Sequence, residues 1–486
     1  MQPKKSSFAG DVLKLVTGTT FAQVIAILAA PILTRLYDPE AFGVTALFVS
    51  ITTIIGIIAC MRYELAIMLP ERDEEAANIL AISIGFVLLI STLTSLIIWF
   101  GQQSLLNWLN VPELRPYLWL IPIMISANGI FFALSSWNSR TKRFGRLSIT
   151  QIIQSFATTG GKVGAGLAGH TTGGGLIGST VLGMITATLT LGGQTWHDDS
   201  HLLRQHITWR DMLIGVKRYR KFPLYHTWAG LFNTISWQLP NFFLVAFFST
   251  TTVGYYALGS RMVRLPMSLI GGSIAKVFFQ RASVAKNEGT LAIVVENVFQ
   301  QLVKIGMFPS IILTFIGQDI FIFIFGESWA EAGVFVQILA PWTFFLFIAS
   351  PMGTLFSVLE RQEFSLYINI ALFTSRLFVL ALGGYLGNAR FMLVLFGISG
   401  VLVYGSLNLI IITMVGIPLR KILYSLLFNF TLCIPAGIIL MGLHLWNAHV
   451  WIVLSVACIL TGIYFGFLIK TDPQIRKLVS QKLFSR

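Results

Sequence analysis

Four cations lie deep within long apolar segments of the sequence. Lys162, Arg261, Arg264 and Arg376 each fall inside a segment long enough to cross a bilayer, and no Asp or Glu lies comparably deep. At about 1.5 Å of helix per residue, Arg264 and Arg376 lie roughly 17 Å, and Lys162 roughly 21 Å, from the start of their segments. A charge at the centre of a membrane helix costs about 2.5–3.5 kcal/mol. We therefore expect these side chains to face a hydrated cavity or an anion.

Neutral polar residues accompany the cations at helical spacing. Gln151, Ser155, Thr158 and Lys162 recur every three or four residues and so share one helix face. The segments 223–248 and 365–387 carry similar polar residues. The alternative to a cavity lining is that these residues join helices through interhelical hydrogen bonds. The residues predicted to line a shared polar cavity are Gln151, Thr158, Asn233, Trp237, Asn241 and Asn369.

A cationic cavity without matching acids suits an anionic cargo. Arg presents a planar fork that binds pairs of phosphate oxygens, and Lys acts as a point charge. The aromatic residues Trp237, Tyr255 and Tyr256 could stack on sugar rings, or they could anchor their helices at the membrane interface. Acids and nucleophiles are not gathered in any one segment. The pattern therefore indicates anion transport rather than catalysis.

Membrane helices must position these residues, because the composition excludes a water-soluble fold. Of the 486 residues, 55% are hydrophobic and 11% are charged, against roughly 25% charged in a soluble domain. Apolar windows of about 20 residues predict an all-α integral membrane protein with about fourteen transmembrane helices. The windows are 12–33, 42–61, 78–100, 117–137, 148–169, 173–193, 223–248, 253–279, 301–325, 333–358, 365–387, 391–415, 422–444 and 448–470.

Basic residues alternate between the connections. Four cations lie between Arg140 and Arg146, and six between Arg204 and Lys221, whereas the connections on either side are poor in Lys and Arg. Basic loops face the cytoplasm, so an even number of crossings places both termini there. The net charge of +14 therefore reports topology. It does not indicate nucleic-acid binding, because the cations are not gathered into one patch.

A weak internal sequence repeat indicates a duplication, and we call its two segments the echo motifs. Gly43-Val-Thr-Ala-Leu47 opens the second window, and Gly254-Tyr-Tyr-Ala-Leu258 opens the eighth. Two six-helix halves of equal orientation predict a parallel repeat about an axis along the membrane normal, with a central site between the halves. The predicted divisions are an N-terminal lobe at 1–193, a basic cytoplasmic linker at 194–222, a C-terminal lobe at 223–415, and two added helices with a basic tail at 416–486.

Three other patterns do not indicate a cofactor or metal. The glycines of 164–169 match GxGxxG, but no strand precedes them, so close helix packing explains them. The histidines of 197–206 match no standard metal-ligand spacing. The three cysteines lie inside apolar windows without ligand spacing, and we expect them to be packing residues; they are Cys60, Cys433 and Cys458.

Two segments resemble signatures of the Wzx-type polysaccharide flippases. The first is Leu33-Thr-Arg-Leu-Tyr-Asp-Pro-Glu-Ala-Phe-Gly43, and the second is Val253–Leu258 followed by Arg261, Arg264 and Pro266. The resemblance covers the whole chain. It implies the fold of the multidrug/oligosaccharidyl-lipid/polysaccharide superfamily, which has two six-helix lobes in a V around a central cavity, here with two added C-terminal helices. It also implies placement in the bacterial inner membrane and an undecaprenyl-diphosphate-linked oligosaccharide as cargo for surface polysaccharides such as O-antigen.

The resemblance also implies a mechanism and partners. In alternating access, the four deep cations bind the diphosphate or anionic sugars, and Arg62 and Lys14 near the cytoplasmic mouth capture the head group first. A polysaccharide polymerase and a chain-length regulator are expected partners. No cofactor is implied; proton or sodium coupling is expected by resemblance, but no residue is indicated for it.

Three other functions remain alternatives. A peptidoglycan lipid precursor flippase would also have fourteen helices and a cationic cavity. A drug/cation antiporter of the same superfamily would need acids within its membrane helices. A membrane-bound polysaccharide polymerase would handle the same lipid-linked sugar, but it would normally carry a large periplasmic loop.

Overall fold

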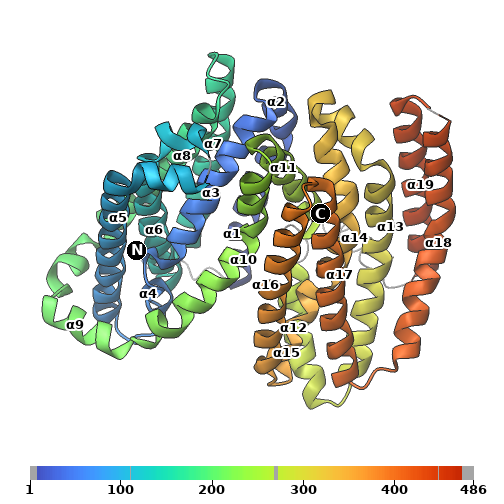
Figure 1. Cartoon of the computed structure of the whole chain (residues 1–486). Helices are drawn as coiled ribbons and strands as arrows, with labels where there is room; N and C mark the ends of the chain where they lie inside the picture. The colour runs from blue at the N-terminus through green and yellow to red at the C-terminus, as the bar shows by residue number, and fades with distance from the viewer. Residues whose placement is uncertain (1–7, 110, 268–271, 447, 473–486) are drawn as a thin grey trace. The chain divides into compact units, whose positions relative to one another are not determined.

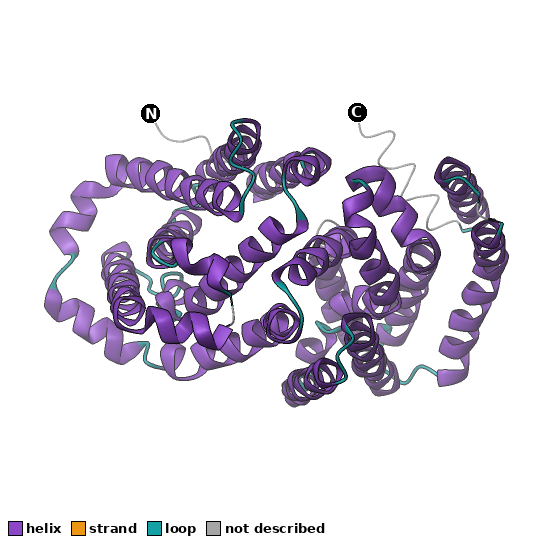
Figure 2. Ribbon diagram, turned by 45° about the horizontal axis from the view of Figure 1, so that its top comes forward, coloured by secondary structure: helices purple, strands orange, loops and turns teal. Residues whose placement is uncertain are grey.

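The computed structural model describes residues 8–109, 111–267, 272–446 and 448–472. Every regular element among these residues is helical, as the purple helices and teal loops of Figure 2 show. The prediction of an all-α fold is therefore confirmed. The chain forms two compact units, residues 1–254 and 255–486, each of which is described by itself below (Figure 1).

The first unit contains ten α-helices among the described residues. Helix α3 begins where Asp38 caps it, because the Asp38 carboxylate accepts a hydrogen bond of 2.8 Å from the Ala41 amide and Pro39 starts the first turn. Asp38 and Pro39 of the first signature segment thus form a helix start. The helices are α1 Phe8–Leu28, α2 Ala30–Leu36, α3 Pro39–Ala59, α4 Tyr63–Ala66, α5 Asp73–Leu109, α6 Leu120–Arg140, α7 Phe144–Leu167, α8 Gly173–His206, α9 Trp209–Arg218 and α10 Thr227–Phe247.

The second unit takes most of α11 and all later helices. Helices α13 and α14 pack together, α14 packs on α17, and α18 and α19 dock on α13. An ion pair between Lys304 and Asp472, at 2.7 Å, and a polar contact between Asp319 and His444, at 2.8 Å, join α13 to this docked region. The helices are α11 Thr250–Pro266, α12 Gly272–Asn287, α13 Leu291–Phe325, α14 Ala330–Met352, α15 Leu355–Val358, α16 Gln362–Tyr385, α17 Ala389–Met414, α18 Leu419–Leu445 and α19 Val450–Thr471.

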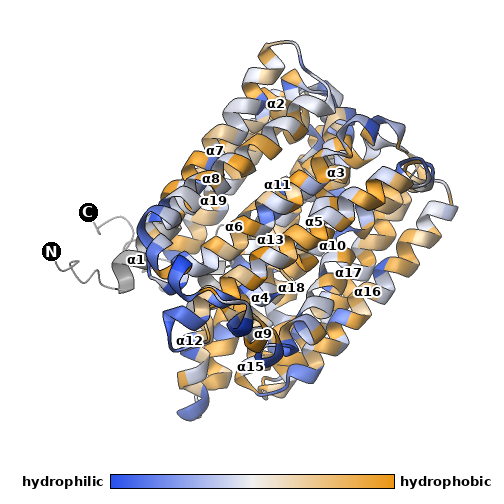
Figure 3. Ribbon diagram, turned by 90° about the vertical axis from the view of Figure 1, so that its left-hand side faces the viewer, coloured by the Kyte–Doolittle hydropathy of each residue, from blue (hydrophilic) through white to orange (hydrophobic). Residues whose placement is uncertain are grey.

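Each of the fourteen predicted windows overlaps a helix or a pair of consecutive helices. In the described part of the chain, eleven helices are long and apolar enough to cross a membrane. The helices α7, α10 and α11 fall outside that set, α11 because it has only 17 residues. These three carry most of the predicted site residues. In Figure 3 the helices are mainly orange, and the blue residues gather near helix ends.

Several helices extend beyond the predicted windows. Helix α5 has 37 residues and α8 has 34, which is about 50–55 Å of helix against a hydrocarbon core of about 30 Å. A helix does not have to end at the membrane surface, because polar residues can form further helical turns in water. The predicted linker at 194–222 is accordingly helical: its first part completes α8, and α9 packs on α5.

The compact units divide later in the chain than the predicted lobes do. Helix α10 packs against α3 and belongs to the first unit, which ends at Gly254. The predicted boundary at residue 223 therefore lies inside the first unit. The echo motifs meet there, because a Cβ on Gly43 would collide with the Thr250 carbonyl and one on Gly254 with the Pro39 carbonyl. Glycine at both positions lets the two helix starts touch.

Candidate functional site

Two of the predicted cations come together in the second unit around two tyrosines. Arg376 of α16 is only 3% exposed, and its Nη2 donates to the Tyr404 hydroxyl of α17 at 3.3 Å. The Arg264 Nε of α11 donates to the Ser260 carbonyl at 3.0 Å. Both guanidinium charges act on the buried hydroxyls of Tyr256 and Tyr404. We call Arg264, Arg376, Tyr256 and Tyr404 the arginine–tyrosine cluster.

Aromatic packing fixes the deeper arginine of this cluster. The Arg376 guanidinium carbon lies 5.6 Å from the centre of the Phe396 ring, close enough for a cation–π contact. The Phe396 ring in turn meets the buried Trp342 edge-on at 5.1 Å. A planar guanidinium held this way keeps a fixed orientation. The cluster could therefore present charge and hydroxyl donors to an anion in a defined geometry.

Arg261 and Asn369 lie at the surface of the second unit. Arg261 is one turn before Arg264 on α11, and its side chain is exposed. Asn369 is also exposed, and its amide donates to the Ser365 carbonyl at 2.8 Å. These two predicted residues are therefore outside the buried arginine–tyrosine cluster.

The polar residues of α7 contact neighbouring helices in the first unit. Gln151 accepts a hydrogen bond of 2.6 Å from the Thr19 hydroxyl of α1, and Thr158 packs directly against Gly183 of α8. Lys162 is half-buried, and its backbone carbonyl accepts from the Tyr37 hydroxyl at 2.7 Å. Gln151 and Thr158 thus have the contacts expected of residues that join helices.

The polar residues of α10 divide into an outer and an inner set. Asn233 is exposed and Trp237 is half-buried. Asn241 is buried, and its amide donates to Ser50 Oγ at 2.8 Å and to Gln238 Oε1 at 3.2 Å. The Ser50 hydroxyl also donates to Gln238, at 3.0 Å. This Ser50–Gln238–Asn241 network fastens α10 to α3.

Arg62 lies in a strained turn beside a buried acid. Its φ of 60° is in the left-handed region, and its Nη1 lies 3.4 Å from Glu64 Oε1. Its guanidinium approaches Gly230 of α10. Glu64 is 8% exposed, and burial raises the pKa of its carboxyl. Lys14 lies in α1, but its side chain is outside the described part of the chain.

Several residues of these groups escaped the sequence prediction. Tyr404 cannot be distinguished by sequence from an interface anchor, and Glu64 has the sequence position of an acid at a helix end. Gln238 carried a signal, because it precedes Asn241 by three residues and so shares its helix face. Asp319 is a second buried acid, 7% exposed and paired with His444.

Metal binding has no candidate among the described residues, which contain no group of three His, Cys, Asp or Glu side chains placed to share an ion. His197 pairs with Asp198 at 2.7 Å. The neighbouring Asp199 binds Arg143 at 2.6 Å. The histidine-containing segment is thus engaged in ion pairs along α8.

The fold is shared with transporters of known structure. A lipid II flippase, MurJ in an inward closed conformation, matches with a TM-score of 0.72 at 12% identity, covering 94% of this chain and 98% of that one. An inward-facing multidrug resistance MATE transporter of the MOP superfamily matches at 0.61 and 16% identity, covering 81% and 94%. A MOP superfamily transporter from Pyrococcus furiosus, whose binding pocket is described as having reverse polarity, matches at 0.53 and 13%, covering 84% and 95%.

The sequence itself matches a family model. No curated protein sequence matches the chain. The model described as "Polysaccharide biosynthesis protein" matches residues 32–333, more than half of the chain and including both echo motifs. The chain is therefore a multi-pass membrane protein of the polysaccharide biosynthesis protein family, with the fold of MOP superfamily transporters.

Proposed function

We propose that the protein is a flippase that moves an undecaprenyl-diphosphate-linked oligosaccharide from the cytoplasmic to the periplasmic leaflet of the bacterial inner membrane. The observation that carries the proposal is the arginine–tyrosine cluster, in which two guanidinium groups converge inside a largely apolar helical unit. A buried charge is costly in a membrane protein. A diphosphate carries negative charge and several oxygen acceptors, which complement two neighbouring guanidinium groups.

Each candidate residue has a role in this mechanism. Arg264 and Arg376 bind the diphosphate, and the Tyr256 and Tyr404 hydroxyls donate hydrogen bonds to it or to sugar oxygens. Lys162 and the exposed Arg261 add positive charge along the route. Arg62 and Lys14 capture the head group on the cytoplasmic side, where we also place both termini. Alternating access then releases the cargo outward to a polymerase and a chain-length regulator.

Complementation tests the proposal. In a strain that lacks the protein, Arg264→Ala should abolish surface polysaccharide and leave lipid-linked precursor on the inside, while Arg264→Lys should restore part of the polymer because it keeps the charge. Arg390→Ala is the matched control, because Arg390 pairs with Glu331 at 2.5 Å on an exposed helix end. Full activity of Arg264→Ala at normal membrane levels would remove this residue from the cargo site.

A second candidate function is flipping of the peptidoglycan lipid precursor. The structural likeness over 94% of the chain to a lipid II flippase favours it. The test is rescue of a strain depleted of its own lipid II flippase. Survival of that strain would support this second function, whereas loss of viability together with normal surface-polysaccharide complementation would support the first. A cation antiporter is disfavoured, since the cluster is itself cationic.

A further inference from the structure

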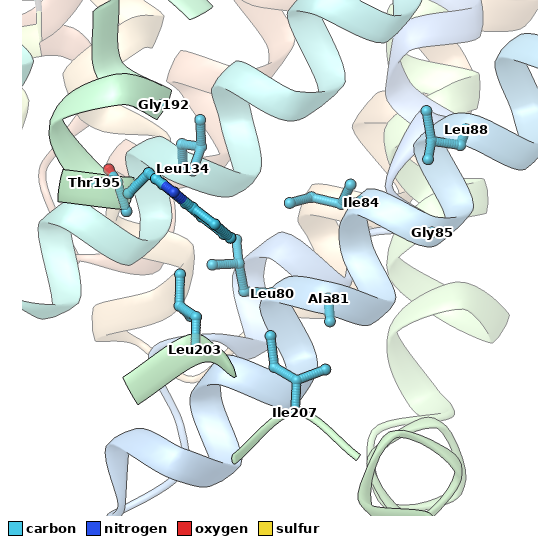
Figure 4. A pocket seen from close by; sticks show the side chains of 11 residues that line it. Leu80, Ala81, Ile84, Gly85, Leu88, Leu134, Gly192, Thr195, Leu203 and Ile207 are labelled. Atoms are coloured by element: carbon cyan, nitrogen blue, oxygen red, sulfur yellow. The ribbon is translucent and has the colours of Figure 1, made fainter. Parts of the chain in front are cut away.

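An apolar groove of about 440 Å³ runs along the first unit between α5, α6 and α8. Figure 4 shows aliphatic side chains turned toward this space, with Leu80, Ile84 and Gly85 on one side and Gly192 and Leu203 on the other. The volume is in the range of sites that hold a small ligand. Leu88, near one end, is 54% exposed, so the groove opens toward the surroundings of the helices.

The groove offers almost no hydrogen-bonding groups. Thr195 is the one side chain with a hydroxyl among its lining residues, and that hydroxyl already donates to the Leu191 carbonyl at 2.8 Å and accepts from Asn138 at 2.9 Å. The indole N–H of Trp196 is the one further donor in this lining, too little to replace the hydration of a sugar. A hydrocarbon chain would lose nothing by entering, and it would cover the exposed apolar surface.

The cationic side chain of Arg204 lies beside the groove. The exposed Arg204 places its guanidinium carbon 4.8 Å from the centre of the Trp196 ring, and Trp196 lines the groove. Arg204 has no ion pair within the described part of the chain. The nearby acids of α8 are already bound, Asp198 by Arg146 and Asp199 by Arg143. The charge offered at this position is therefore positive.

Helix α9 continues from this site and has the character of an interfacial helix. Its Val216 and Tyr219 pack on the core of the first unit. Beside this packed face, Trp209 and Leu213 are 72% and 52% exposed, next to basic residues such as Lys217. Short helices of this composition lie at the boundary between lipid headgroups and acyl chains. With α9 in the interface, the groove would lie at headgroup level, within reach of an acyl chain and a phosphate.

We propose that the groove binds an anionic glycerophospholipid from the leaflet that faces the basic loops. One acyl chain lies along α5 between Leu80 and Leu88, and the phosphate meets Arg204. Anionic lipids attract Lys and Arg at the membrane surface, which favours this occupant over a zwitterionic one. The site is separate from the proposed cargo function and does not depend on it.

Native mass spectrometry of the full chain tests the proposal. The probes are phosphatidylglycerol and phosphatidylethanolamine with identical acyl chains, and undecaprenyl phosphate as competitor. Phosphatidylglycerol adducts should exceed phosphatidylethanolamine adducts several-fold. Gly85→Leu should lower them several-fold, because a Cβ at Gly85 meets no atom within 4 Å and a larger side chain there would occupy the groove. Arg204→Gln should bring the two lipids to equal occupancy.

Matched variants outside the groove distinguish a loss of lipid binding from a loss of folding. Gly101→Leu, on the same helix with equally open space, and Arg420→Gln, another exposed cation, should bind lipid as the unmodified protein does. Gly192→Leu is a second groove-filling variant, since its nearest neighbour lies 3.5 Å away. The proposal is overturned if both filling variants retain their phosphatidylglycerol, if the two phospholipids bind equally, or if undecaprenyl phosphate displaces phosphatidylglycerol at equal concentration.

Discussion

Two buried charged residues of this protein, Arg376 and Glu64, contact polar or aromatic side chains in place of water. Arg376 has a tyrosine hydroxyl and a phenylalanine ring as neighbours. Glu64 has Arg62 at 3.4 Å, although its Oε2 has no hydrogen-bond partner among the described atoms. A buried carboxylate with one unpaired oxygen is costly, because it loses hydration without full compensation. Glu64 is therefore the acid in the first unit whose protonation should matter most.

The raised pKa of Glu64 predicts a pH-dependent stability. Burial is the main cause of the increase, opposed by Arg62. Because the native state then holds the proton more tightly than the unfolded state, stability should decline as the pH rises from the unfolded pKa through the folded pKa. Glu64→Gln, which is neutral at every pH, should flatten that decline in the melting temperature of the purified protein between about pH 4 and pH 8.

An exposed acid provides the comparison for this measurement. Glu71→Gln removes a carboxylate from the same connection without touching a buried site, so its melting temperatures should follow those of the unmodified protein. Parallel curves for the unmodified protein and Glu64→Gln would show that Glu64 titrates alike in both states. The pKa shift would then have no part in stability.

At the scale of elements, small residues decide which helices can touch. Gly183 of α8 accommodates Thr158 of α7, and Gly43 of α3 accommodates the start of α11. Close approach of this kind is how membrane helices gain packing energy without a hydrophobic driving force between them. The polar network of Ser50, Gln238 and Asn241 adds hydrogen bonds to the α3–α10 contact.

Gly43→Ala should lower both the membrane level of the protein and its melting temperature. The added methyl group would overlap the backbone carbonyl of Thr250, and a backbone atom cannot rotate away as a side chain can. Overpacking of this kind costs about 1–3 kcal/mol. Gly85→Ala is the control: its Cβ meets open space, so it should leave both quantities unchanged or slightly raised. Equal behaviour of the two variants would contradict the close contact.

At the scale of the whole molecule, the basic segments lie at corresponding ends of successive helices. Arg140 at the end of α6 binds Asp73 at the start of α5, at 2.9 Å. Arg143 and Arg146 at the start of α7 bind acids at the end of α8. The charges that predict a cytoplasmic location thus gather at one end of the first unit, as the positive-inside rule requires.

Reporter fusions test this orientation. Alkaline phosphatase, which is active only outside the cytoplasm, should be active when fused after Thr171, between α7 and α8. It should be inactive after Gln205 or at the C-terminal Arg486, where a fluorescent protein should instead fold and fluoresce. Enzyme activity at Arg486 would mean an odd number of crossings from a cytoplasmic N-terminus, and the prediction that both termini are cytoplasmic would be wrong.

The sequence by itself determined the helical, membrane-spanning character of the protein. All fourteen predicted windows overlap helices, because a bilayer leaves each segment to satisfy its own backbone hydrogen bonds, which is a local requirement. Deep cations such as Arg264 and Arg376 were also visible, since a charge within an apolar run is a local anomaly. Helix ends were less visible, as in α8, because a helix continues into polar sequence without an apolar signal.

Only the tertiary structure decided which polar residues meet. Spacing along α7 placed Gln151 and Thr158 on one face, but it could not say that α1 and α8 cover them. In the same way, Arg376 and Tyr404 lie on different helices, and nothing local brings them together. The physical reason is that helical periodicity specifies a direction from one helix axis. The partner in that direction depends on the packing of every other helix.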